Sequence, residues 1–174
     1  MRTVIAGEYS ELDAWIARRR ALGQDRLDEV WDGEYHVPAA PNFWHAVVAA
    51  QLAMVLGRIG APLHLLVSTE FNLGRHERNF RVPDLGLHRT VSREDWVHTA
   101  AMVVEVVSPH DESWLKFDHY AAHGVDEVLI ADPADRSLHL FVLADGEYRP
   151  SECSLLLGVT VAELHAAVEW PGVS

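Results

Sequence analysis

The sequence contains little cysteine and little positive charge. Its 174 residues include one cysteine, Cys153, so no disulfide can form within the chain, and a reducing cytoplasm is the expected location. Lysine and arginine number 14, against 26 aspartates and glutamates, and the net charge is −12. Because proteins that coat nucleic acids neutralise phosphates with basic residues, this balance disfavours nonspecific nucleic-acid binding.

A long apolar run is also missing. The most apolar segment, residues 46–56, contains Gln51 and is far shorter than the roughly 20 residues of a membrane-spanning helix. Arg2, Glu8 and Glu11 interrupt the N-terminal segment, so we expect no signal peptide and no membrane contact. Hydrophobic residues make up 49% and charged residues 23%, which is an ordinary globular composition and predicts a single domain over residues 1–174.

Hydrophobic spacing and turn residues predict an α/β (α+β) fold. The Asp32-Gly33 pair predicts a hairpin over residues 29–37, because its tight turn needs positive φ. Asn42 can cap a helix, and Thr160 with Glu163 forms a capping box. We expect a mixed sheet of about five strands, flanked by the second and third helices. The predicted helices are 11–22, 43–59, 112–123 and 161–169, and the further predicted strands are 63–68, 80–88, 101–107, 127–131 and 137–143.

Two acidic residues interrupt apolar strand segments. Asp84 follows Pro83 inside segment 80–88, and Glu105 lies in the middle of segment 101–107. Carboxylates in apolar strands are costly unless they are paired, hydrogen-bonded or bound to a metal. On neighbouring strands the two would suit Mg²⁺, which takes one or two carboxylates with water and phosphate oxygens, and the Val106 carbonyl could add a ligand. A hydrogen-bonded carboxylate and a structural ion pair are the alternatives.

The single lysine of the chain, Lys116, falls on the predicted helix that follows the Glu105 strand. From there its ammonium could reach back to the carboxylates. A solvated helix residue is the alternative for this lysine.

The order and spacing of several motifs resemble the Uma-two family of restriction-endonuclease-like proteins, a branch of the PD-(D/E)xK nuclease superfamily. The resemblance covers about residues 28–145. The matching motifs are Asp32-Gly33-Glu34, Pro41 followed by His45, Val82-Pro83-Asp84-Leu85, Val104-Glu105-Val106-Val107-Ser108-Pro109, Lys116 with Tyr120, and residues 124–133 from Gly124-Val125 to Asp132-Pro133.

The resemblance implies a restriction-endonuclease-like mixed β-sheet core with an N-terminal helix and hairpin. It also implies that Asp84 and Glu105 are metal ligands, helped by the Val106 carbonyl, with Mg²⁺ or Mn²⁺ as the ion. One departure is plain: the lysine expected two positions after the glutamate falls at Val107. Residues i and i+2 share a strand face, so a lysine at position 107 would point into the same site as Glu105. The resemblance implies that Lys116 takes the place of that lysine.

Further candidates lie around these residues. Glu34 and His45 would assist from the rim, although Glu34 could be merely exposed and His45 could be merely a capping-turn residue. Glu70 is a weaker candidate. His119 and His123 have the i, i+4 spacing of zinc ligands, with His110 nearby, but the glutamate of an HExxH motif is absent. We therefore expect solvent-exposed histidines there.

These residues favour a metal-dependent endonuclease that hydrolyses phosphodiester bonds of DNA. Two alternatives stay open: a non-enzymatic binding or assembly module on a nuclease fold, which Val107 and the acidic charge favour, and a hydrolase of small phosphate esters, which the charge allows. The aromatic residues are compatible with a homodimer.

Overall fold

A six-stranded mixed sheet forms the centre of the computed structural model, which describes residues 3–4, 9–108, 112–170 and 172. Parallel pairing joins its two middle strands, and the other pairs are antiparallel. In spatial order the strands are β12 (Glu147–Ser151), β11 (Ser137–Ala144), β10 (Glu127–Asp132), β9 (Met102–Val106), β7 (Leu85–His88) and β4 (Leu66–Thr69). The predicted sheet is thus confirmed, with one strand more than expected.

Helices cover both faces of this sheet, because its central strand is apolar on both sides. Val104 and Val106 of β9 pack in one cluster with α2 (Phe43–Gly60) and α4 (Val161–Ala166). Val103 packs on the other face, in a second cluster that contains Tyr120 of α3 (Phe117–Ala122). A 3₁₀ turn, η2 (Ser113–Lys116), leads into α3, so the helix predicted over 112–123 consists of two shorter pieces.

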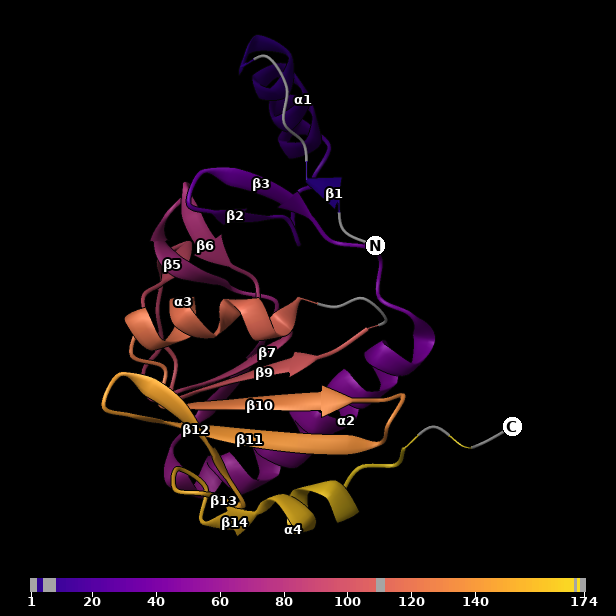
Figure 1. Ribbon diagram of the computed structural model, residues 1–174, viewed down its shortest axis with the longest axis vertical. Coiled ribbons are helices and arrows are strands. Elements are labelled where there is room, and N and C mark those ends of the chain that lie inside the picture. Colours follow the sequence, from indigo (N-terminus) through magenta and orange to yellow (C-terminus); the bar gives the residue numbers. More distant parts are fainter. Residues whose placement is uncertain (1–2, 5–8, 109–111, 171, 173–174) are drawn as a thin grey trace.

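A second six-stranded sheet stands beside the first. Its hairpin has the predicted turn, with φ of 49° at Asp32 and 94° at Gly33. Figure 1 shows helix α1 (Tyr9–Ala21) beyond this hairpin, at the opposite end of the molecule from α4. In spatial order the strands are β1 (Thr3–Val4), β3 (Glu34–Val37), β2 (Glu29–Trp31), β6 (Asn79–Arg81), β5 (Asn72–His76) and β8 (Trp96–Val97).

The single strand predicted over residues 80–88 is wrong. The chain leaves the second sheet after Arg81 and enters the first sheet at Leu85, so Asp84 lies in the crossing between β6 and β7. Pro83 has no N–H group to give to a ladder, which favours an interruption at this point.

Smaller differences occur at other element ends. The 3₁₀ turn η1 (Ala61–Leu63) delays the strand predicted from Leu63, which begins at Leu66. Two short strands, β13 (Cys153–Ser154) and β14 (Val159–Thr160), precede the capping box of α4. Pro109 and His110 lie outside the described residues.

Helix α2 continues into η1, so the apolar helical run is longer than the segment 46–56 that stood out in the sequence. With η1 it gives 21 residues, Phe43–Leu63, that by length and composition alone could cross a membrane. In the structure Val48, Leu52 and Leu56 are fully buried against the sheet. Packing in the core therefore accounts for one apolar face of the helix, whereas Phe43 and Met54 are exposed.

The expectation that His119 faces solvent is wrong. His119 is 7% exposed, its Nε2 lies 3.0 Å from the Leu73 carbonyl oxygen, and its ring stacks on His123 at 4.1 Å. Burial lowers the pKa of His119 to about 4, against an ordinary value of 6.5. The two histidines are thus part of the packing of α3.

This burial predicts a pH dependence of stability. Between pH 6.5 and 4 the unfolded chain binds a proton at His119 that the folded chain does not, so the free energy of unfolding falls as the pH falls through this window. His119→Gln keeps a donor for the Leu73 carbonyl and removes the titration, and we expect a flatter dependence. Urea unfolding of both proteins across this range measures it, and parallel curves would contradict the assignment.

Candidate active site

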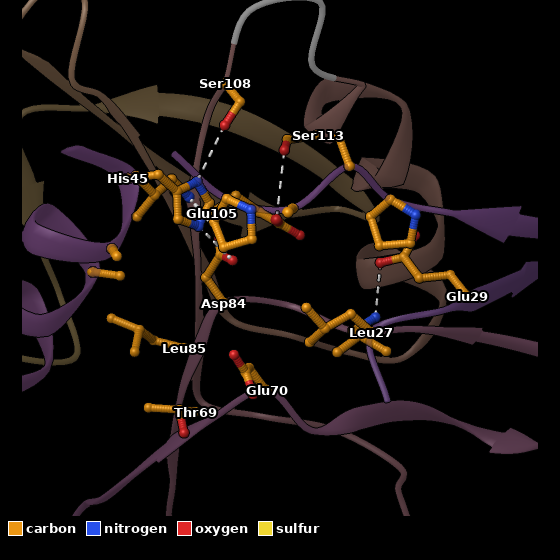
Figure 2. Close-up of a pocket in the computed structure, with 18 of the residues that line it drawn as sticks. Leu27, Glu29, His45, Thr69, Glu70, Asp84, Leu85, Glu105, Ser108 and Ser113 are labelled. Atoms are coloured by element: carbon orange, nitrogen blue, oxygen red, sulfur yellow. Dashed lines mark hydrogen bonds and ion pairs between the residues drawn. The ribbon is translucent and has the colours of Figure 1, made fainter. Parts of the chain in front are cut away.

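The acidic residues singled out in the sequence meet where the two sheets adjoin. Leu85 of β7 pairs with Val104 of β9, so the next residues in register, Asp84 and Glu105, lie opposite each other. Glu105 is on the β9 face that α3 covers, together with Val103. Figure 2 shows Asp84 and Glu105 side by side in the pocket, with His45 and Ser113 next to them.

Lys116, the last residue of η2, extends its side chain into this group. Its Nζ lies 3.0 and 3.2 Å from the two oxygens of Glu105 and 2.9 Å from Oε1 of Glu29. The side chain is 12% exposed, so this is a largely buried ion-paired group. Burial opposes the charge on Lys116, but the carboxylates of Glu105 and Glu29 outweigh it and raise the pKa of Lys116. The lysine is therefore a cation and not a solvated helix residue.

Glu105 is almost completely buried, with 3% exposure. The hydroxyl of Tyr120 donates a hydrogen bond to Oε1, and Ser113 Oγ lies 3.4 Å from Oε2. Burial raises the pKa of Glu105 to about 8, while Lys116 lowers it and the charges of Asp84 and Glu29 raise it further. The site thus contains more carboxylate than one ammonium neutralises, and it favours the uptake of another positive charge.

Asp84 is held by a backbone amide and a histidine. Val106 N donates to Oδ2 at 2.7 Å, and His45 Nε2 lies 3.1 Å from Oδ1. His45 Nδ1 lies 3.3 Å from Ser108 Oγ, so an Nε2–H tautomer donates to Asp84 and accepts from the serine. The Asn42 cap, which accepts from His45 N at 2.9 Å, fixes this turn of α2. The histidine therefore fixes the orientation of Asp84.

The hairpin contributes Glu29 to the site, and the structure does not bring Glu34 there. Glu34 sits next to the turn, with a side chain 73% exposed, and it does not line the pocket. Glu29, at the other end of the hairpin, accepts from Val82 N at 2.8 Å and from Trp31 Nε1 at 2.7 Å. An acidic residue alternating with buried Val30 was the sequence signal that could have identified Glu29.

Val107 occupies the place of the missing strand lysine. It packs, partly buried, against the cluster that contains Tyr120 and Val128. The ammonium of Lys116 reaches Glu105 from η2 instead. Glu70 lines the same pocket and pairs with Arg26 at 2.7 Å.

The donor set fits a cation that keeps several water ligands. In the part of the chain that the structure describes, no group of three or more His, Cys, Asp and Glu side chains is arranged to hold a metal. Mg²⁺ needs only one or two carboxylates, the rest of its shell being water and substrate oxygens. Asp84 and Glu105, with the backbone of Val106 at the pocket, meet that requirement.

The arrangement of sheets and helices matches the fold of a solved structure. It is similar to the crystal structure of "a putative nuclease belonging to DUF820" from Anabaena variabilis, with a TM-score of 0.64, 14% identity, and coverage of 80% of this chain and 90% of that chain. Residues 9–170 match the model of the Uma2 family, described as "Putative restriction endonuclease", and the chain belongs to that family. No curated protein matches the chain.

The buried charges predict strong coupling between Lys116 and Glu105. Lys116→Met leaves Glu105 and Glu29 buried without their cation, and we expect a loss of about 3–5 kcal/mol in the free energy of unfolding. Glu105→Gln should then cost less in the Lys116→Met background than in the wild type, because its ion pair with Lys116 is already lost. Denaturant unfolding of the two single variants and the double variant measures the coupling. Additive losses would contradict it.

Proposed function

We propose that this protein hydrolyses phosphodiester bonds of DNA with Mg²⁺ or Mn²⁺ at the pocket that Asp84, Glu105 and Lys116 line. The observation that carries the proposal is that Asp84, which directly precedes β7, and Glu105 of the adjacent strand β9 line one pocket, with the Lys116 ammonium 3.0 Å from Glu105. Membership of the Uma2 family and the nuclease fold support it.

Asp84, Glu105 and the Val106 carbonyl would hold the cation. When bound, the cation lowers the pKa of a water molecule and neutralises charge on the scissile phosphate. His45 keeps Asp84 in one orientation, and the Val106 amide satisfies the other carboxylate oxygen. These contacts spare the site any reorganisation of Asp84 during the reaction.

Lys116 supplies a largely buried positive charge next to the carboxylates of this pocket. Glu29 also holds the ammonium, at 2.9 Å, so Lys116 would keep one carboxylate partner if Glu105 bound a cation. From there the ammonium can stabilise the charge that develops on the phosphate oxygens. Glu29 is therefore a residue that positions Lys116.

The proposal predicts a metal-dependent cleavage that Asp84→Asn removes. Asparagine keeps an oxygen for the Val106 amide and loses the charge that binds a cation, so cleavage should fall roughly 100-fold or more. The free energy of unfolding should hold or rise, because Asp84 repels Glu105. Nicking of supercoiled plasmid and cutting of single-stranded DNA, each with Mn²⁺ and with EDTA, measure the effect.

Asp118→Asn is the matched control, since Asp118 is an exposed acid on α3 that does not line the pocket. It should cleave like the wild type. Equal cleavage by Asp84→Asn would indicate a contaminating nuclease. Absence of cleavage by the wild-type protein on every substrate would favour the binding module.

A further inference from the structure

Strand β4 is an outer strand of the first sheet, and one of its two sides is open. Among the described strands it pairs with β7 alone. Glu70 N extends this ladder by donating to the Asp84 carbonyl oxygen at 3.2 Å. Because backbone groups of an antiparallel strand point alternately to either side, Val67 and Thr69 direct their N–H and C=O groups away from β7. Within the described residues these outward groups have no hydrogen-bond partner.

The other outer strand of the same sheet, β12, is protected against pairing. It contains Pro150, which has no N–H group, and the charged residues Glu147 and Arg149. The sequence of β4 is Leu-Val-Ser-Thr, with neither a charge nor a proline. Apolar side chains are uncovered beside it, since Leu66 is 49% and Leu63 47% exposed. An open edge without charge favours pairing with another strand.

The alternation of the open groups fits a second copy of the same strand. In an antiparallel pair centred on Ser68, Val67 lies opposite Thr69 of the partner subunit, and Thr69 lies opposite the partner's Val67. Each outward N–H then meets an outward C=O, and a two-fold axis passes between the two Ser68 residues. The open groups of both strands are satisfied at once, and the protected β12 edge stops the sheet from growing further.

The charges at this edge also favour the antiparallel register. The net charge of −12 makes two copies repel each other, so a stable contact between them must be low in charge. The acidic residue at the end of β4, Glu70, is neutralised by Arg26 at 2.7 Å. In the register centred on Ser68, Glu70 lies opposite the partner's Leu66 and diagonal to the partner's His64, which can carry positive charge. The two Glu70 side chains are therefore kept apart.

Helix α2 covers β4 and leaves apolar surface beside it. Gly57 and Gly60 of this helix lie against Val67 and Leu65. Met54, three residues before Gly57 and so on the same side of the helix, is 68% exposed. A two-fold axis perpendicular to the sheet puts both α2 helices on one face, one on each side of the seam. Their exposed apolar residues can then add to an interface that a short strand pair alone would leave small.

We infer that two copies of this chain pair through β4 and form a two-fold dimer with one continuous sheet. Thr69 and Glu70 also line the pocket, so the two pockets border the seam. The dimer does not depend on the proposed hydrolysis.

Light scattering and sedimentation of the intact chain over a dilution series test the association. We expect twice the 19.5 kDa mass of one copy, falling on dilution. Thr69→Pro removes an outward N–H and leaves the ladder with β7 intact, which a sheet edge tolerates. It should raise the dissociation constant of the dimer roughly 10- to 100-fold. Thr69→Val, the matched control, keeps the amide and the branched shape and should stay within about twofold of the wild type.

A disulfide tests the register without a proline in the strand. In a Cys153→Ser chain, Ser68→Cys puts the thiols of the two copies opposite each other, with Cβ atoms roughly 4.5 Å apart. A disulfide can form at this spacing, so oxidation should give a covalent dimer. Ala134→Cys, in the exposed turn between β10 and β11, is the control and should stay uncrosslinked.

A chain that is monomeric at every concentration would overturn the inference. So would a dimer that Thr69→Pro leaves as stable as the wild type, or one in which Ser68→Cys crosslinks no better than Ala134→Cys. Either result would place the contact on another surface.

Discussion

The ion-paired ammonium of Lys116 is the interaction on which the rest of the site depends. Its two carboxylate partners come from different sheets, Glu29 from β2 and Glu105 from β9. A buried carboxylate is costly without a counter-charge, so this one side chain makes both acidic positions tolerable. The same ion-paired group therefore joins the two sheets, and no other lysine of the chain could take its place.

Hydrophobic periodicity and turn residues were sufficient to predict much of the fold. The Asp32-Gly33 turn, the Asn42 cap and the Thr160–Glu163 capping box are local signals, and all are present in the structure. The crossing at Pro83 was missed because apolar residues on both sides of Pro83-Asp84 made residues 80–88 look like one strand, although the two ends of that segment belong to different sheets. Which sheet a strand joins depends on tertiary packing that the local sequence does not contain.

Site residues could be predicted where a charged group interrupts an apolar segment, because burying such a group is energetically costly. Asp84 and Glu105 were identified because carboxylates in apolar segments must be paired, hydrogen-bonded or bound to a metal. The structure brings both of them together with Lys116 and His45. Glu34 and Glu29 show the limit of this reasoning. Both lie on the same face of the hairpin, and only the position of the hairpin relative to the first sheet decides which one enters the pocket. The burial of His119 likewise depends on how α3 packs.

The crossing of residues 82–84 between the sheets has a mechanical consequence. The Val82 amide is bonded to Glu29 in one sheet, and two residues later Asp84 is bonded to the Val106 amide in the other. A change in the angle between the sheets would pull on Asp84 and Glu29 at once, through a linker too short to absorb it. If the hairpin moved away from the first sheet, the distance between Glu29 and Asp84 would change with it. The width of the pocket entrance is therefore coupled to the spacing of these two carboxylates.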